Sequence, residues 1–266
     1  MTGLGTTDLA AASAASDRFP PPRVLPDSLR AAWSALFSGG SAYRFEPAAL
    51  DALPEPARRW LRHAVPAGTL CHPAVGLELR GRIRLAGWRS FRARQVLAAP
   101  HGYLWAERTR LCGLPVSGYD RLTDSAGEMR HTLLGCLPLV HAAGPDLTRS
   151  AAGRLAAETV LWPPAALDRA IDWQQDGPDS VTMLVPVAGC AHPVSLTVAQ
   201  DGRLLRVTTP RWTRLGRGPY RLHEFVVEVR QEIRHAGVLL PAAVVAGYAT
   251  EPPFISQTVD RLVTPR

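Results

Sequence analysis

The sequence contains no lysine and no asparagine, and all 30 of its basic residues are arginine. Without a lysine amine, the chain cannot form a Walker-type P-loop, a kinase-like ATP site or a Schiff base with pyridoxal phosphate. Without asparagine, it has no N-glycosylation site, no Cys-His-Asn triad and no Asn-Gly hairpin turn. Because both residues are missing together while Ala and Arg abound, we interpret their absence as compositional bias. The exclusions hold whatever the cause.

Cysteine is scarce, and long apolar runs are missing. The four cysteines, Cys71, Cys112, Cys136 and Cys190, form no C-x-x-C pair, which excludes a zinc knuckle and a thioredoxin motif. No run of ~18 apolar residues occurs that could span a membrane. Residues 1–23 lack the basic and unbroken apolar regions of a signal peptide. We therefore expect a cytoplasmic protein with reduced thiols.

The 266 residues are 46% hydrophobic and 20% charged, which is typical of a soluble globular protein. The net charge of +7 is unevenly spread. Eight Arg and a single acid, Glu107, lie between residues 80 and 110, and six Arg with no acid lie between residues 203 and 221. Arg80, Arg82 and Arg84 alternate with apolar residues, which favours a solvated sheet face. No helix-turn-helix, zinc-finger or RNP-type pattern accompanies the charge, so nucleic acid is disfavoured as a partner.

The N-terminal region predicts a leader and two helices. Residues 1–25 are rich in small and polar residues and in proline, which predicts a flexible leader before a single domain over residues 26–266. Leu29, Trp33 and Phe37 share a helical stripe that ends at Gly39. A second apolar stripe around Trp60 predicts another helix after the break at residue 54.

From about residue 75 the hydrophobic period changes to two, and strand-length segments alternate with Gly, Pro and Asp turns, which predicts an antiparallel meander. Asp146 is expected to cap one helix, which ends before Pro163. Strand patterns then return to the end of the chain. The fold class expected is α+β: a single large curled antiparallel sheet, or half-barrel, with N-terminal helices and one helix inserted between two strand blocks. Such a sheet, plugged by a helix, leaves an apolar cavity.

Motifs for chemistry are few. The eight histidines show no H-E-x-x-H or i, i+4 pairing, so we predict no metal site. No G-x-S-x-G elbow and no complete dinucleotide loop occurs, so we predict neither a catalytic residue nor a cofactor. Asp120, Asp124 and Glu128 cluster, but hairpin turns explain such acids more simply than catalysis does.

Glu158 lies on the inserted helix near the surface that should meet the sheet, with Arg154 one turn before it. The favoured interpretation is an ion pair on the helix surface, and the alternative is a polar anchor at the cavity. Trp88, Trp105, Trp162 and Trp173 are candidates for a pocket wall, although aromatic residues also fill cores. The predicted ligand-binding residues are Trp88, Trp105, Tyr119, Asp120, Arg154, Glu158 and Trp162.

Two resemblances bear on these predictions. The most specific motif is R-x-x-x-E-x-x-x-W-P, here Arg154, Glu158, Trp162 and Pro163, and a W-x-x-F-x-A-x-Q segment begins at Trp88. Over residues 50–215 the chain resembles the uncharacterised bacterial domain of unknown function 6544 family, which implies no reaction. The order of strands, helix and strands is also similar to the half-barrel of bacterial lipoprotein carriers, whose concave face holds acyl chains.

Three functions remain open from the sequence. The first is a non-enzymatic module that binds an apolar, lipid-like molecule, which predicts a cavity of ~300 Å³ or more lined by Trp or Leu. The second is an enzyme of unplaced class in the same concavity, which predicts a buried carboxyl or His with a perturbed pKa. The third is a partner-binding protein whose Arg faces meet an acidic surface.

Overall fold

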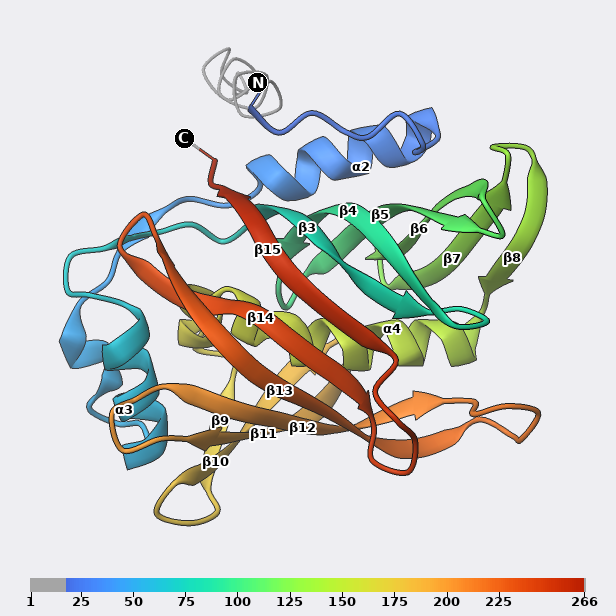
Figure 1. Cartoon of the computed structure of the whole chain (residues 1–266). Helices are drawn as coiled ribbons and strands as arrows, with labels where there is room; N and C mark the ends of the chain where they lie inside the picture. The colour runs from blue at the N-terminus through green and yellow to red at the C-terminus, as the bar shows by residue number, and fades with distance from the viewer. Residues whose placement is uncertain (1–17, 266) are drawn as a thin grey trace.

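The computed structural model describes residues 18–265, in which a curved 13-stranded antiparallel sheet surrounds one helix (Figure 1). The helices are α2 (Asp27–Ser38), α3 (Glu55–Ala64) and α4 (Pro145–Glu158), with 3₁₀ turns η1 (Pro47–Leu50), η2 (Thr159–Leu161) and η3 (Pro163–Leu167). The first strand block comprises β3 (Val75–Arg84), β4 (Trp88–Ala98), β5 (Gly102–Leu111), β6 (Leu114–Thr123), β7 (Ala126–Leu133) and β8 (Leu137–Ala143). The second comprises β9 (Asp172–Gln175), β10 (Ser180–Val187), β11 (Cys190–Val198), β12 (Leu204–Thr213), β13 (Arg221–His235), β14 (Val238–Tyr248) and β15 (Ile255–Val263). A separate two-stranded sheet pairs β1 (Tyr43–Arg44) with β2 (Leu70–Cys71).

The hairpin turns contain left-handed backbone positions that are filled without asparagine. A two-residue turn that matches the twist of the strands needs positive φ at both central residues, which Asn-Gly usually supplies. In five turns the second residue is glycine and an ordinary residue takes the first left-handed position, whereas Asp124 and Ser125 fill both positions between β6 and β7. The pairs are Ala86-Gly87, Cys112-Gly113, Leu134-Gly135, Ala188-Gly189 and Ala236-Gly237.

The sheet is continuous because β15 joins its two halves. The strand order is β8-β7-β6-β5-β4-β3-β15-β14-β13-β12-β11-β10-β9, and the edge strands β8 and β9 are not paired with each other within residues 18–265. The first block is the expected meander of neighbouring strands. The curled, open antiparallel sheet with one helix inserted between two strand blocks is therefore confirmed.

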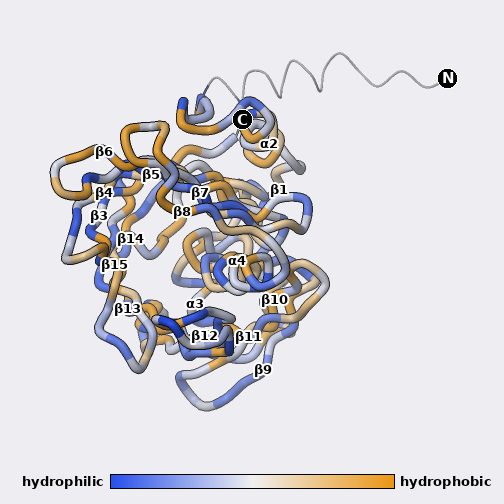
Figure 2. Tube along the Cα trace, turned by 90° about the vertical axis from the view of Figure 1, so that its right-hand side faces the viewer, coloured by the Kyte–Doolittle hydropathy of each residue, from blue (hydrophilic) through white to orange (hydrophobic). Residues whose placement is uncertain are grey.

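Helix α4 lies inside the curve of the sheet and packs against strands of both blocks, including β6, β7, β11 and β12 (Figure 2). Alanine and glycine dominate its buried positions, so the helix approaches the strands closely. Its N-cap residue is Gly144, and no side chain caps it. The expected cap by Asp146 is wrong, because the Asp146 carboxylate instead accepts a hydrogen bond from Trp212 Nε1 at 2.8 Å.

Helix α2 covers the outer face of the sheet over β4 and β5 (Figure 1). Leu29, Trp33 and Phe37 form its buried stripe, as the periodicity predicts. Phe19 is also fully buried and stacks on Trp33 with ring centroids 5.4 Å apart. The leader expected up to residue 25 is therefore corrected for residues 18–25, of which Phe19 and Leu25 belong to the α2 core. The rest of the expected leader, residues 1–17, lies outside the described residues.

Candidate ligand-binding cavity

A cavity of about 550 Å³ lies between the concave face of the sheet and α4. Its walls are mainly apolar and come from β3, β5 to β8, α4, η2 and β12 to β15. The apolar lining includes Leu85, Leu111, Leu139, Leu161, Phe225, Val229, Val244 and Ala246. The predicted hydrophobic cavity lined by Trp and Leu side chains is thus present in the fold.

Arg154 of α4 organises a polar cluster in this otherwise apolar wall. Its Nε lies 2.7 Å from Glu158 Oε1 and its Nη1 lies 2.9 Å from Asp120 Oδ2. The guanidinium also sits over the ring of Trp105, 5.1 Å from the ring centroid. Gln95 Nε2 donates to the other oxygen of Glu158 at 2.6 Å. A guanidinium held between two carboxylates and an aromatic face is fixed in orientation, which suits it to position a bound group.

A second ion pair, between His131 and Glu107, lies beside the Arg154 cluster. His131 Nε2 of β7 lies 3.0 Å from Glu107 Oε1 of β5 and 3.9 Å from Asp120 Oδ1. The strand between them, β6, places Gly118 opposite both Glu107 and His131. A β-carbon at Gly118 would lie 2.4 Å from His131 Cδ2, so the imidazole occupies the space that a side chain there would fill. Gly118 therefore lets the pair form over a third strand.

Five buried polar atoms of cavity-lining residues have no hydrogen-bond partner: Trp105 Nε1, Glu107 Oε2, Asp120 Oδ1, His131 Nε2 and Arg211 Nε. His131 contacts Glu107 as an ion pair, but its N–H is not aligned for a hydrogen bond. A buried polar atom without a partner costs ~1–3 kcal/mol, so most are satisfied in folded proteins. All five residues line the cavity, which places both donors and acceptors within reach of an occupant.

Burial and neighbouring charges shift the pKa values of this cluster. Burial raises the pKa of Asp120, and the nearby carboxylates of Glu107 and Glu158 raise it further. The positive charges of Arg154 and His131 lower it, but they do not outweigh burial. Burial alone would lower the pKa of His131, but the carboxylates of Glu107 and Asp120 outweigh it, so the pKa is raised. The pKa of Arg154 is also raised, since its neighbouring carboxylates outweigh burial. His131 is therefore positively charged over a wider pH range than free histidine.

The raised pKa of His131 predicts a pH-dependent contribution to stability. Protonated His131 is favoured in the folded state, so its contribution is complete below the unfolded value of ~6.5 and is lost as pH rises through the folded pKa. We expect the difference in melting temperature between wild type and His131→Gln to be larger at pH 6 than at pH 9. Thermal unfolding of both proteins at each pH measures it.

Histidines whose pKa burial lowers, such as His192, have the opposite pH dependence, and they are common to both proteins. Their contributions therefore cancel when the melting temperature of His131→Gln is subtracted from that of wild type. A difference that is constant with pH would contradict the assigned charge of His131.

The structure brings four of the seven predicted ligand-binding residues together. Trp105, Asp120, Arg154 and Glu158 all line the cavity. The ion pair between Arg154 and Glu158 is present, but it faces the cavity wall and not a solvated helix surface, which corrects the favoured interpretation. Whether these four side chains contact a ligand stays a prediction.

The other three predicted residues lie elsewhere. Tyr119 points to the outer face, where it belongs to the α2 core and donates to Glu128 Oε1 at 2.9 Å. Trp88 is 37% exposed at the start of β4. Trp162 is fully buried in the main core and its Nε1 donates to the carbonyl of His72 at 2.8 Å. Trp173 packs near Trp60 and is not part of the cavity lining.

Sequence reasoning missed Glu107 and His131 as members of the site. The signal for Glu107 was available, because it is the one acid among eight arginines and lies two residues from Trp105, on the same face of β5. No comparable signal existed for His131, since its approach to Glu107 depends on strand register and on Gly118.

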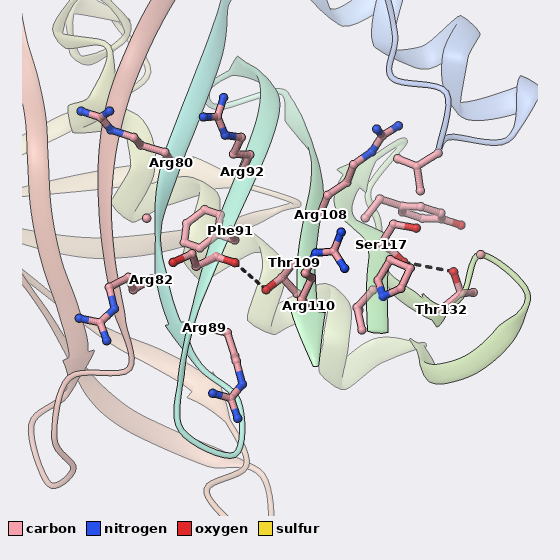
Figure 3. Close-up of a pocket in the computed structure, with 18 of the residues that line it drawn as sticks. Arg80, Arg82, Arg89, Phe91, Arg92, Arg108, Thr109, Arg110, Ser117 and Thr132 are labelled. Atoms are coloured by element: carbon pink, nitrogen blue, oxygen red, sulfur yellow. Dashed lines mark hydrogen bonds between the residues drawn. The ribbon is translucent and has the colours of Figure 1, made fainter. Parts of the chain in front are cut away.

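The outer face of the same strands carries a broad hollow of about 1540 Å³ (Figure 3). Arginine side chains from β3, β4 and β5 stand around it, and the Thr109 hydroxyl donates a hydrogen bond to the backbone carbonyl of Ser90 at 2.8 Å. The exposure of Arg80, Arg82 and Arg84 above the buried Leu77 and Leu79 confirms the predicted solvated face. The arginines are Arg23, Arg80, Arg82, Arg89, Arg92, Arg108, Arg110 and Arg130, and the lining includes no acidic residue.

A third hollow of about 970 Å³ lies between α2, η1 and η3. None of its lining side chains has a buried polar atom without a partner. Across residues 18–265, no three His, Cys, Asp or Glu side chains are grouped so as to hold a metal ion. In the same part of the chain, no helix has the length and apolar character needed to cross a membrane.

The fold and the cavity define a half-barrel α+β protein with a partly open, mainly apolar cavity. Residues 43–254 match the sequence model of the family of unknown function DUF6544, and the chain belongs to this family. A comparison with curated proteins finds no match.

Solved structures resemble the chain at low identity. A LolA superfamily protein from Nitrosomonas europaea is 9% identical, with a TM-score of 0.45, over 79% of this chain and 92% of that one. A DUF1329 family protein from Desulfovibrio piger is 13% identical, with a TM-score of 0.39, over 83% of this chain and 94% of that one. Similarity at this level supports no inference about what the chain binds.

Proposed function

We propose that this protein binds an amphipathic small molecule, with the apolar part of the molecule between the sheet and α4 and its polar group at the Arg154 cluster. The observation that carries the proposal is an apolar cavity bordered by buried polar atoms that lack partners. A volume of about 550 Å³ lies within the usual range for small-molecule sites, which combine apolar walls with a few oriented polar groups.

The unpartnered atoms indicate which polar group fits. Trp105 Nε1 can only donate, whereas Glu107 Oε2 and Asp120 Oδ1 accept while these carboxyls are ionised. A hydroxyl group both donates and accepts, so it can serve both kinds of atom. The cavity lining holds three carboxyls, of Glu107, Asp120 and Glu158, and three basic residues, Arg154, His131 and Arg211, so the count of charges alone does not select between a neutral and a charged group. The expected ligand class is therefore a hydroxyl-bearing molecule with a long apolar body.

The direct test is native mass spectrometry of the purified full-length protein, followed by organic extraction and analysis of what was bound. We expect a stoichiometric, lipid-like mass that is released by organic solvent. In parallel, the protein should bind the apolar fluorescent probe N-phenyl-1-naphthylamine with enhanced emission. A protein that carries no such molecule and also fails to bind the probe would contradict the proposal.

A cavity-filling variant locates the bound probe. Ala246 of β14 lines the cavity, so Ala246→Phe should weaken probe binding at least about tenfold by occupying the space. Ala243 lies on the same strand outside the cavity lining, which makes Ala243→Phe the matched control, with affinity expected close to wild type. Fluorescence titration measures both affinities, and circular dichroism checks folding. Equal probe affinity in a folded Ala246→Phe variant would place the probe elsewhere.

Acid–base catalysis on the bound molecule is a second candidate function, supported by one observation. Asp120 has a raised pKa and lies beside His131, so a proton donor and a proton acceptor face the same cavity. Incubating the extracted molecule with wild type and with Asp120→Asn tests this. A change in its mass or isomer composition with wild type alone would establish catalysis, and an unchanged molecule in both would leave binding as the function.

A further inference from the structure

Four hairpin turns gather at one end of the half-barrel, on the right in Figure 1. In this antiparallel sheet, β3, β5, β7 and β12 all run toward this end, so the turns that follow them share it. We call these turns the hairpin rim and define it as residues 84–89, 110–115, 133–138 and 213–222. The backbone N–H of Leu134 donates to the carbonyl of Pro115 at 2.8 Å, which ties two of the turns together.

The hairpin rim concentrates exposed apolar side chains. Of the eleven large hydrophobic residues exposed among residues 18–265, six lie in it: Leu85, Trp88, Leu114, Leu134, Leu137 and Leu222. Figure 2 views the molecule from this end and shows hydrophobic turns beside β5 and β6. Single exposed leucines are ordinary, but their collection at the tips of adjacent hairpins marks an interaction surface.

The same turns are strongly basic. They contain six arginines, Arg84, Arg89, Arg110, Arg214, Arg217 and Arg221, and no acidic residue. Two of these side chains are held at the turns themselves, because Arg89 donates to the carbonyl of Ala86 at 3.0 Å and Arg110 to that of Gly113 at 2.8 Å. The two other connections toward which strands run in this direction, between β10 and β11 and between β14 and β15, contribute one acid, Glu251. The positive charge therefore lies directly beside the exposed leucines.

We propose that the hairpin rim docks on an anionic lipid bilayer, with its leucines and Trp88 in the acyl boundary and its arginines on the phosphate headgroups. Apolar insertion together with attraction to anionic lipid is the basis of interfacial membrane binding, and tryptophan favours that depth. A nucleic acid would match the arginines but gives exposed leucines no role, because its bases stack on aromatic rings and the rim has two, Trp88, which is exposed, and Tyr220, which is half-buried.

The position of the cavity supports the same orientation. Leu85 of the hairpin rim lines the cavity, as do Leu111 at the end of β5 and Leu139 of β8. A membrane at this end would therefore face the apolar interior, so an apolar molecule could pass between bilayer and cavity with little exposure to water. This inference goes beyond the proposed function, since membrane docking does not require that the cavity be filled.

Flotation of the full-length protein with vesicles tests the docking. We expect binding to phosphatidylcholine vesicles that contain phosphatidylglycerol, weak binding to pure phosphatidylcholine, and loss of binding as salt rises. The double variant Arg84→Ser/Arg217→Ser should weaken binding on the order of tenfold. Its matched control, Arg169→Ser/Arg206→Ser, removes two exposed arginines outside the hairpin rim and should bind as wild type does.

The apolar contribution needs its own pair of variants. Leu114→Ser/Leu137→Ser removes leucines that are 45% and 52% exposed and lie outside the cavity lining. Its control, Leu70→Ser/Leu205→Ser, removes leucines of 47% and 42% exposure away from the hairpin rim. We expect the rim variant to lose vesicle binding while both variants keep their melting temperature and their affinity for N-phenyl-1-naphthylamine.

Three outcomes would overturn the inference: no binding to anionic vesicles, equal loss of binding in rim and control variants, or equally tight binding of duplex DNA that the leucine substitutions leave unchanged. The last would assign the arginines to a nucleic acid. Because the probe reports on the cavity and flotation on the rim, failure of docking and failure of ligand binding are separate results.

Discussion

Replacing Arg154 by methionine is expected to lower the free energy of unfolding by about 3–5 kcal/mol, because removing one partner of a buried ion pair leaves an uncompensated charge. The guanidinium contacts the carboxylates of Asp120 and Glu158 and covers the ring of Trp105. Methionine keeps much of the volume of the side chain and removes only the charge and the hydrogen bonds. Urea unfolding followed by circular dichroism measures the loss.

A surface ion pair supplies the control. Arg230 pairs with Glu228 where both side chains are largely exposed, so Arg230→Met should cost no more than about 1 kcal/mol. Neutralising the two carboxyls in the triple variant Arg154→Met/Asp120→Asn/Glu158→Gln should recover part of the stability lost in Arg154→Met. If Arg154→Met were as stable as the surface control, the cluster would not depend on Arg154 for its charge balance.

Replacing Trp162 by alanine should cost about 3–5 kcal/mol, because it empties a fully buried site and removes a hydrogen bond. Trp162 is 1% exposed and its indole N–H donates to the carbonyl of His72. The matched control is Trp88→Ala, since Trp88 is 37% exposed and its removal should change stability by about 0.5 kcal/mol or less. Thermal and urea unfolding of the two variants measure both effects.

Variants of Trp162 also test whether this residue of the motif has a structural role or contacts a ligand. Trp162→Phe keeps most of the volume but loses the indole N–H, so it should lie between wild type and Trp162→Ala in stability. A destabilisation of Trp162→Ala no larger than that of Trp88→Ala would contradict a structural role. Loss of probe binding with unchanged stability would instead indicate that Trp162 contacts the ligand.

The sequence predicts the helices, strands and turns of this fold because each of them is determined by residues that are close together in the chain. Alternating apolar residues define the inner face of each strand, and glycine at the second position of five hairpin turns marks where the chain reverses. The stripe of Leu29, Trp33 and Phe37 predicts α2 for the same reason. Short-range spacing is also sufficient for the pair between Arg154 and Glu158, which lie one helical turn apart.

Features that depend on distant residues could not be predicted in this way. Phe19 lies in a segment of small and polar residues and is ordered because Trp33 offers it a partner. His131 meets Glu107 only through the register of three strands. The sequence predicts Tyr119 and Asp120 in one site, but adjacent residues of a strand point to opposite faces, so only Asp120 lies at the cavity.

The place of β15 between β3 and β14 has a consequence for how the protein is made. Every other strand of the large sheet is synthesised before it, yet β15 alone joins the two blocks. Until residues 255–263 leave the ribosome, β3 and β14 each present an unpaired edge, which can recruit another chain. The nascent chain is therefore most prone to aggregation after β14 has emerged and before β15 has, when two half-sheets exist and the strand that joins them does not.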